Sequence, residues 1–133
     1  MKVAELMQAP VVAVDADSSV ADAVVTLADA HISGLPVLDG SKRLVGVLTT
    51  TDVLEAAAEC ETAEERERLF ERTAVRDVMT PRPLTIRPDA DVAEASQQML
   101  YLEVHRLFVE DEGRLAGVIS QSDVVRAVAT AKL

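Results

Sequence analysis

The sequence predicts a mixed α/β (α+β) fold made of two copies of a β-α-β-β-α unit. Three observations lead to this prediction: the chain matches itself at a fixed offset, each copy contains an amphipathic helix, and each copy contains two apolar runs joined by turn residues. A unit of roughly 50 to 60 residues buries too little surface to be stable alone. We therefore expect the two copies to pack on each other about a pseudo-twofold axis.

The internal repeat extends over most of the 133 residues. A shift of 72 places sets Met7 on Met79, and a shift of 71 sets Asp52 on Asp123. The change of offset corresponds to a deletion of one residue where LDGSKR of the first repeat aligns with EDEGR of the second, and Gly and Asp mark a hairpin turn there. The predicted domain organisation is a first repeat, a helical connector and a second repeat, over residues 1–56, 57–74 and 75–133.

Each repeat begins with a short extended lead, VVAV or PLTI, and continues into an amphipathic helix. The apolar face of the first helix consists of Val20, Ala23, Val24, Leu27 and Ala28. The corresponding face in the second repeat consists of Val92, Ala95, Met99 and Leu102. Asp91 and Glu94 have the spacing of a capping box at the start of that helix.

Two strands and a further helix complete each repeat. The strand pairs are LPVL with LVGVL, and RLFVE with RLAGVI; the closing helices start near Thr50 and Gln121. The connector, AAAECETAEERERLFERTA, lacks Gly and Pro, and we expect a solvated helix that extends the closing helix of the first repeat. It contains Cys60, the single cysteine, which allows no internal disulfide and is typical of a reducing compartment.

The composition excludes several functional classes. The formal net charge is −10, the pI is near 4.5, and the aromatic residues are Phe70, Tyr101 and Phe108. Nucleic-acid binders need a basic face, and single-strand binders also need stacking platforms. The chain has no apolar run near 18 residues and no signal-peptide core at its N-terminus. We expect a soluble, cytoplasmic protein with no nucleic-acid or membrane partner.

Motifs for catalysis and for metal binding are missing from the sequence. His31, His105 and Cys60 do not have the spacing of a metal site. Neither a phosphate-binding loop nor a dinucleotide-binding pattern is present. We therefore expect no catalytic residue, no metal, no cofactor and no enzymatic activity.

The two repeats resemble a tandem pair of CBS domains, the cystathionine β-synthase type. The resemblance rests on VAELMQAP and VRDVMTPRP at the repeat starts, ISGLPVLD and VHRLFVED at the second strands, and GVLTTTD and GVISQSD at the strand-to-helix turns. It covers almost the entire chain and implies a Bateman module, a disc with two clefts that is often paired into a homodimer. Such modules commonly bind AMP, ADP or ATP, and some bind S-adenosylmethionine.

The strand-to-helix turns carry the first candidate ligand residues: Thr49, Asp52, Ser120 and Asp123. Their spacing favours a capping box, in which side chains satisfy backbone N–H groups at the helix start. A carboxylate also accepts two hydrogen bonds from the cis-diol of a ribose, and a helix N-terminus favours an anion. The two interpretations are compatible. The resemblance implies that both aspartates bind ribose, with the two hydroxyl residues alongside.

Adenine would be held by aliphatic side chains because aromatic residues are nearly absent. The candidate residues of this slot are Val12 and Val14, or Leu84 and Ile86. For each of them, an ordinary role in the core of a strand is at least as good an interpretation.

Phosphate groups need cations or aligned N–H groups, and the two repeats differ in their cations. The second repeat has His105 and Arg106 where the first has Ser33 and Gly34. The resemblance to the γ subunit of AMP-activated protein kinase implies that the His-Arg pair contacts phosphate, whereas a surface salt bridge is the alternative for the arginine. Arg87 is a weaker candidate. One occupied cleft is therefore favoured over two.

Three functions remain open from the sequence. The first is a regulatory module that binds an adenosine-containing ligand in the cleft between the repeats and passes a conformational change to a separate, unknown partner protein. The second is a structural dimerisation module with vestigial clefts, favoured by the lack of cations in the first repeat. The third is an enzyme, which is the least supported function. S-adenosylmethionine is an alternative ligand for the first function.

Overall fold

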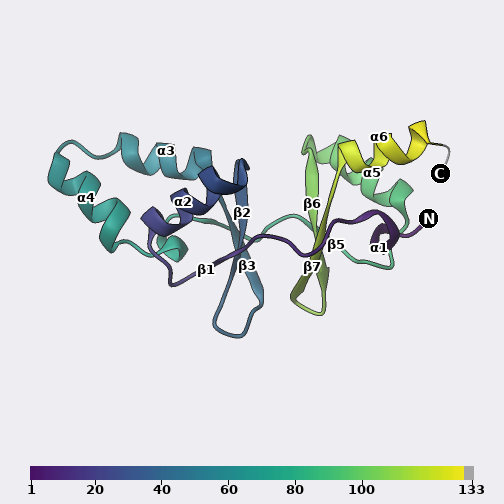
Figure 1. Cartoon of the computed structure of the whole chain (residues 1–133), viewed down its shortest axis with the longest axis horizontal. Coiled ribbons are helices and arrows are strands. Elements are labelled where there is room, and N and C mark those ends of the chain that lie inside the picture. Colours follow the sequence, from purple (N-terminus) through teal and green to yellow (C-terminus); the bar gives the residue numbers. More distant parts are fainter. Residues whose placement is uncertain (131–133) are drawn as a thin grey trace. The chain divides into compact units, whose positions relative to one another are not determined.

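The computed structural model describes residues 1–130, and it contains two small sheets with helices packed on them (Figure 1). The chain divides into two compact units, which we describe separately. Unit 1 consists of Met1–Val11 and Leu84–Leu133, and unit 2 consists of Val12–Pro83. The expected mixed α/β fold class is confirmed.

Unit 2 contains a four-stranded sheet in the order β1-β2-β3-β4. β1 pairs with β2 in parallel, and the other neighbours are antiparallel. The strands and helices of unit 2 are β1 (Val14–Asp15), α2 (Val20–Ala30), β2 (Gly34–Leu38), β3 (Leu44–Thr49), α3 (Thr50–Ala58), α4 (Ala63–Arg72), the 3-10 helix η1 (Val75–Asp77) and β4 (Thr80–Pro81). Its core includes the fully buried Leu35, Val37, Leu48 and Val75, which come from β2, β3 and η1.

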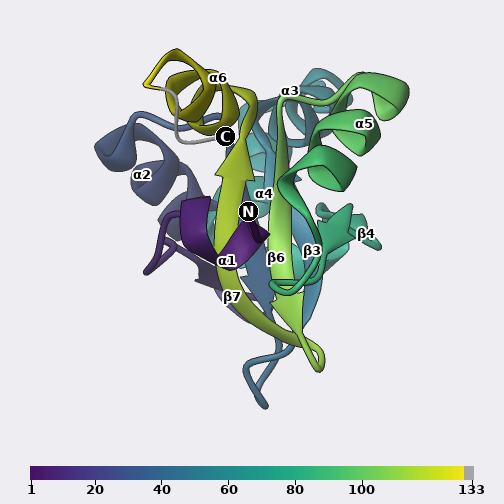
Figure 2. The same cartoon turned by 90° about the vertical axis from the view of Figure 1, so that its right-hand side faces the viewer.

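Unit 1 contains a three-stranded sheet in the order β5-β6-β7, again parallel and then antiparallel. Its elements are α1 (Val3–Leu6), β5 (Thr85–Ile86), α5 (Val92–Leu102), β6 (Arg106–Asp111), β7 (Arg114–Ser120) and α6 (Gln121–Ala129). Figure 2 shows α1 lying against β7, although the two are far apart in the sequence. The core combines residues of both segments, since Val3 packs with Leu107, Val109 and Ile119.

The segment that precedes the lead of each repeat, residues 1–11 or 75–83, packs in the unit formed by the other repeat, and we call these two the exchanged segments. In unit 1, Gln8 and Val118 exchange two backbone hydrogen bonds of 2.8 and 3.0 Å. A Cβ atom at Gly117 would lie 2.7 Å from the Sδ of Met7, so only glycine leaves room for this strand contact. Each compact unit therefore combines most of one sequence repeat with the exchanged segment of the other.

Unit 2 contains the same close contact. β4 pairs with β3, and a Cβ atom at Gly46 would lie 2.5 Å from the Sδ of Met79. The two methionines that match in the internal repeat are thus equivalent core contacts, each with the glycine of the other repeat.

Two local expectations need correction. The connector is helical, but α3 ends at its C-cap residue Glu59 and a separate helix begins after Thr62, whose Oγ1 accepts the N–H of Glu65 at 3.1 Å. The carboxylate of Asp91 makes no capping hydrogen bond in α5. It accepts instead from Nζ of Lys2 at 3.0 Å, because the exchanged N-terminal segment supplies a charged donor there.

Candidate functional site

In unit 1, the polar candidates of the second repeat gather at one end of the sheet. Arg106, at the start of β6, lies opposite Ser120, at the end of β7. Side chains on directly opposed residues of an antiparallel pair have Cβ atoms about 4.5–5.5 Å apart. The N–H of Gln121 also donates to the carbonyl of His105 at 2.9 Å. The structure therefore brings the His-Arg pair to the turn between β7 and α6.

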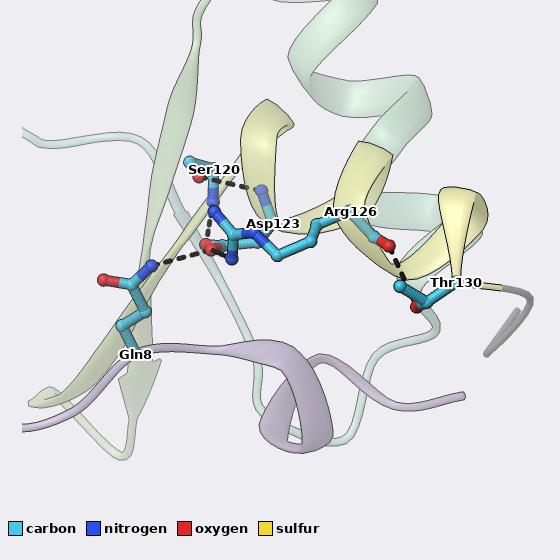
Figure 3. A network of polar contacts seen from close by, with 5 residues as sticks. All are labelled: Gln8, Ser120, Asp123, Arg126 and Thr130. Atoms are coloured by element: carbon cyan, nitrogen blue, oxygen red, sulfur yellow. Dashed lines mark hydrogen bonds and ion pairs between the residues drawn. The ribbon is translucent and has the colours of Figure 1, made fainter.

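Asp123 is held in that turn by a network of hydrogen bonds (Figure 3). Its N–H donates to Oγ of Ser120 at 3.1 Å, and its Oδ2 accepts the N–H of Ser120 at 2.9 Å. Its Oδ1 accepts from Nε2 of Gln8 at 2.7 Å and from Nη1 of Arg126 at 3.4 Å. At 4% exposure, Asp123 is the buried charged side chain of residues 1–130. The predicted capping box is confirmed, and the carboxylate has additional donors.

The matching turn of unit 2 has the same capping box. The N–H of Asp52 donates to Oγ1 of Thr49 at 3.0 Å, and Oδ2 of Asp52 accepts the N–H of Thr49 at 2.9 Å. Oδ1 of Asp52 accepts from Oγ1 of Thr80 at 2.8 Å. Gly34 is opposite Thr49, and Glu55 occupies the position that corresponds to Arg126. Unit 2 therefore repeats the turn without the cations.

The aliphatic candidates divide between surface and core. Leu84 is 43% exposed, and its carbonyl accepts the N–H of Phe108 at 3.2 Å, which places it beside the start of β6. Ile86 is buried in the core of unit 1. In unit 2, Val12 is 49% exposed, whereas Val14 packs against the core. Leu84 and Val12 have free apolar surface for a ligand, and the other two serve as core residues.

Arg87 is not brought together with the other phosphate candidates. Ile86 pairs with Val109, so Arg87 lies beyond the far end of β5 from Arg106. At about 3.3 Å per residue, the separation along the sheet is on the order of 13 Å. The Nε of Arg87 donates to Asp89 at 3.1 Å, and its side chain lines a separate cavity of about 400 Å³.

Three residues of these turns were not identified from the sequence: Gln8, Thr80 and Arg126. Gln8 and Thr80 are equivalent at the 72-residue shift, and both contact the aspartate of the other repeat. Their equivalent positions in the repeat could have indicated a shared role, but Gln and Thr differ in type. The sequence also does not predict that residues 1–11 and 75–83 pack in the unit of the other repeat. Within residues 1–130, no group of three His, Cys, Asp or Glu residues is arranged to hold a metal ion. In the same residues, no helix has the length and apolar character needed to cross a bilayer.

Two stretches of the chain, residues 3–59 and 75–130, match the family model described as CBS domain. The chloroplastic CBS domain-containing protein CBSX2 of Arabidopsis thaliana is 31% identical over 131 residues, covering 83% of this chain and 55% of CBSX2. The chain thus spans about half the length of that relative. The uncharacterized protein MJ1426 of Methanocaldococcus jannaschii is 27% identical, covering 96% of this chain and 91% of MJ1426.

Solved structures share the fold. A crystal structure of CBSX2 in complex with AMP has a TM-score of 0.82 at 31% identity and covers 99% of this chain and 98% of that one. The CBS domain pair of MJ0100, in complex with 5-methylthioadenosine and S-adenosylmethionine, has a TM-score of 0.77 at 21% identity and 98% coverage of both chains. The likeness to MJ0100 concerns the fold alone. Because the family model matches most of the chain in two successive copies, the chain belongs to the CBS domain family and is a tandem CBS pair, or Bateman module.

Proposed function

We propose that this chain is a non-enzymatic regulatory module that binds an adenosine-containing ligand of the AMP, ADP and ATP class in unit 1. The observation that carries the proposal is the convergence of His105, Arg106, Ser120 and Asp123 at one end of the sheet. The complex of the related CBSX2 with AMP supports this choice of ligand class.

Each part of such a ligand has a chemical counterpart at this end of unit 1. The carboxylate of Asp123 would accept from the ribose diol, and Ser120 lies beside it. Arg106 and His105 would contact the phosphate, since a guanidinium forms charge-assisted hydrogen bonds with phosphate oxygens. The exposed Leu84 would contact adenine.

Unit 2 is a poorer site for an anionic ligand. It has Ser33 and Gly34 in place of the His-Arg pair, and Glu55 stands one helical turn from Asp52. A phosphate beside two carboxylates would be repelled. We therefore expect one nucleotide per chain.

The output of the module would pass to a separate partner protein, through a ligand that stabilises one arrangement of the chain over another. We also propose a homodimer. Large apolar side chains on α5 and α6 support a protein contact there, because Leu100 is 72% exposed, Tyr101 88% and Val125 65%. The cytoplasm remains the compartment predicted from the sequence.

A structural dimerisation module with vestigial clefts is the second candidate. It is favoured by the network in Figure 3, in which the chain's own Gln8 and Arg126 already donate to Asp123. The two functions differ in whether a nucleotide reaches this carboxylate.

Calorimetry with AMP, ATP and S-adenosylmethionine tests the proposal. We expect AMP or ATP to bind and Arg106→Ala to weaken binding about tenfold or more, because a hydrogen bond to a charged group contributes roughly 1.5–3 kcal/mol. Arg87→Ala is the matched control, and it should leave the affinity unchanged. Tightest binding of S-adenosylmethionine, with no effect of Arg106→Ala, would change the ligand class. Absence of heat and of thermal stabilisation at millimolar ligand would favour the structural function.

A further inference from the structure

The two equivalent carboxylates differ in their remaining capacity to accept hydrogen bonds. A carboxylate has two oxygens and about four lone-pair positions. Among the described residues, Asp123 accepts from Ser120, Gln8 and Arg126. Asp52 accepts from Thr49 and Thr80. A cis-diol brings two donors, so Asp52 has room for both, whereas Asp123 has room for about one.

Burial separates the two carboxylates in the same direction. Asp123 is 4% exposed, whereas Asp52 is only half-buried. The two side chains that donate to Oδ1 of Asp123 lie at the surface: Gln8 is exposed, and the side chain of Arg126 is 67% exposed. A ligand that reaches Asp123 must therefore move one of these two side chains.

Gln8 is the side chain that a diol replaces more easily. Its amide is a neutral donor, and a ribose hydroxyl is a neutral donor of similar strength. Arg126 carries a full charge, so it still attracts the carboxylate after its direct hydrogen bond is lost. An exposed amide that is released into water also finds new partners there at once.

We propose that Gln8 competes with the ribose diol for Oδ1 of Asp123, so that the exchanged N-terminal segment sets the affinity of unit 1 for diol ligands. This inference rests on the proposed function. It assigns different roles to Gln8 and Thr80 despite their equivalent positions, because Asp52 can accept a diol without losing Thr80.

Calorimetry with AMP on Gln8→Ala is the first test. Removal of the competitor should tighten AMP binding about threefold to tenfold, since one hydrogen bond contributes about 0.5–1.5 kcal/mol net. The gain should shrink for 2′-deoxy-AMP, which has one hydroxyl fewer at this position. Thr80→Val is the matched control and should not tighten AMP binding. A residue that only supports the fold would not produce a gain that depends on the 2′-hydroxyl.

The side-chain amide of Gln8 gives a second test on the unmodified protein. Its nitrogen–proton NMR signals should move toward the positions of a solvated amide when AMP is added, and move less with 2′-deoxy-AMP. AMP binding with unchanged Gln8 signals, or with equal or weaker affinity in Gln8→Ala, overturns the competition and leaves the proposed function intact. AMP binding to Gln8→Ala but not to the unmodified chain supports a stronger competition. Absence of binding to both proteins overturns both proposals.

Discussion

Units 1 and 2 share a frame and differ in the chemistry placed upon it. Each unit has a parallel and an antiparallel strand pair, a capping box after the last long strand, and an exchanged segment that packs on a strand glycine. Each also has a helix C-cap residue in the left-handed conformation, His31 with φ 54° or Glu103 with φ 56°. Features that satisfy the backbone are therefore present in both units.

Unit 2 has an additional strand, β4, and an additional helix, α4, and the units also differ in side chains at the equivalent turns. The unit 1 residues His105, Arg106 and Arg126 correspond in unit 2 to Ser33, Gly34 and Glu55. In unit 1, Arg126 donates to the carboxylate of Asp123, and His105 and Arg106 lie at the same end of the sheet, whereas unit 2 has no basic residue at these three positions. The same frame can therefore carry side chains of different charge at equivalent positions.

Substitutions of the two strand glycines, Gly117 and Gly46, should have the strongest effect on stability. Gly117→Ala and Gly46→Ala should each destabilise the protein by about 1–3 kcal/mol, because the added methyl group overpacks the contact with the exchanged segment. The new Cβ would lie 2.9 Å from the backbone oxygen of Gln8 or of Thr80. Chemical denaturation measures the change. Met7→Ala should rescue Gly117→Ala only in part, since the backbone contact remains. A negligible effect of either glycine substitution would contradict the equivalence of the two exchanged segments.

The second prediction exchanges the chemistry between the units. His105→Ser with Arg106→Gly should weaken AMP binding about tenfold or more, by loss of charge-assisted hydrogen bonds. Ser33→His with Gly34→Arg should introduce AMP binding in unit 2. The second pair should be tolerated, because a Cβ at Gly34 would meet its nearest side-chain atom at an ordinary 3.7 Å. Calorimetric stoichiometry measures the result, and an unchanged affinity in the first variant would count against the phosphate role of the pair.

The third prediction concerns the left-handed C-cap residues. His31→Gly and Glu103→Gly should each stabilise the protein by about 0.5–1 kcal/mol, because residues with a Cβ are disfavoured in this conformation. The alanine variants are controls and should show no such gain. Thermal unfolding measures both, and a gain in one unit alone would break the equivalence of the two helix ends.

The smallest change in stability should come from removing the contact between Lys2 and Asp91 in unit 1. The equivalent positions in unit 2 are Ala74 and Ser19. The hydrogen bond from Lys2 and the positive charge of Lys2 lower the pKa of Asp91, and the same hydrogen bond and the negative charge of Asp91 raise the pKa of Lys2. The folded-state pKa of Asp91 lies below its unfolded value, so its contribution is present above that value and is lost as the pH falls. The contribution of Lys2 is lost as the pH rises through its raised pKa. Lys2→Met should therefore be slightly less stable near neutral pH and match the unmodified protein in acid, as pH-dependent thermal unfolding would reveal.

Much of the frame was predictable because its causes are local. Ser120 and Asp123, or Thr49 and Asp52, stand three residues apart and close a capping box with backbone groups of the same turn. The amphipathic spacing in α2 and α5 likewise requires only neighbouring turns of one helix. The break between α3 and α4 escaped prediction, since Ala, Glu and Arg favour a helix and the N-cap at Thr62 gave a weaker signal.

The sequence alone is enough to place the two repeats, the main β-α-β-β-α order within each, the turn aspartates and the His-Arg pair. The packing of the exchanged segments is visible in the tertiary structure alone. Through this packing, Gln8 reaches Asp123 across 115 positions and Thr80 reaches Asp52 across 28. A capping box joins residues that are always three apart, so its spacing is visible in the sequence. A contact between distant segments has no fixed spacing and cannot be seen there. The contact needs a strand glycine that leaves room for the exchanged segment, and each repeat has one, so the sequence does not show which glycine each segment contacts.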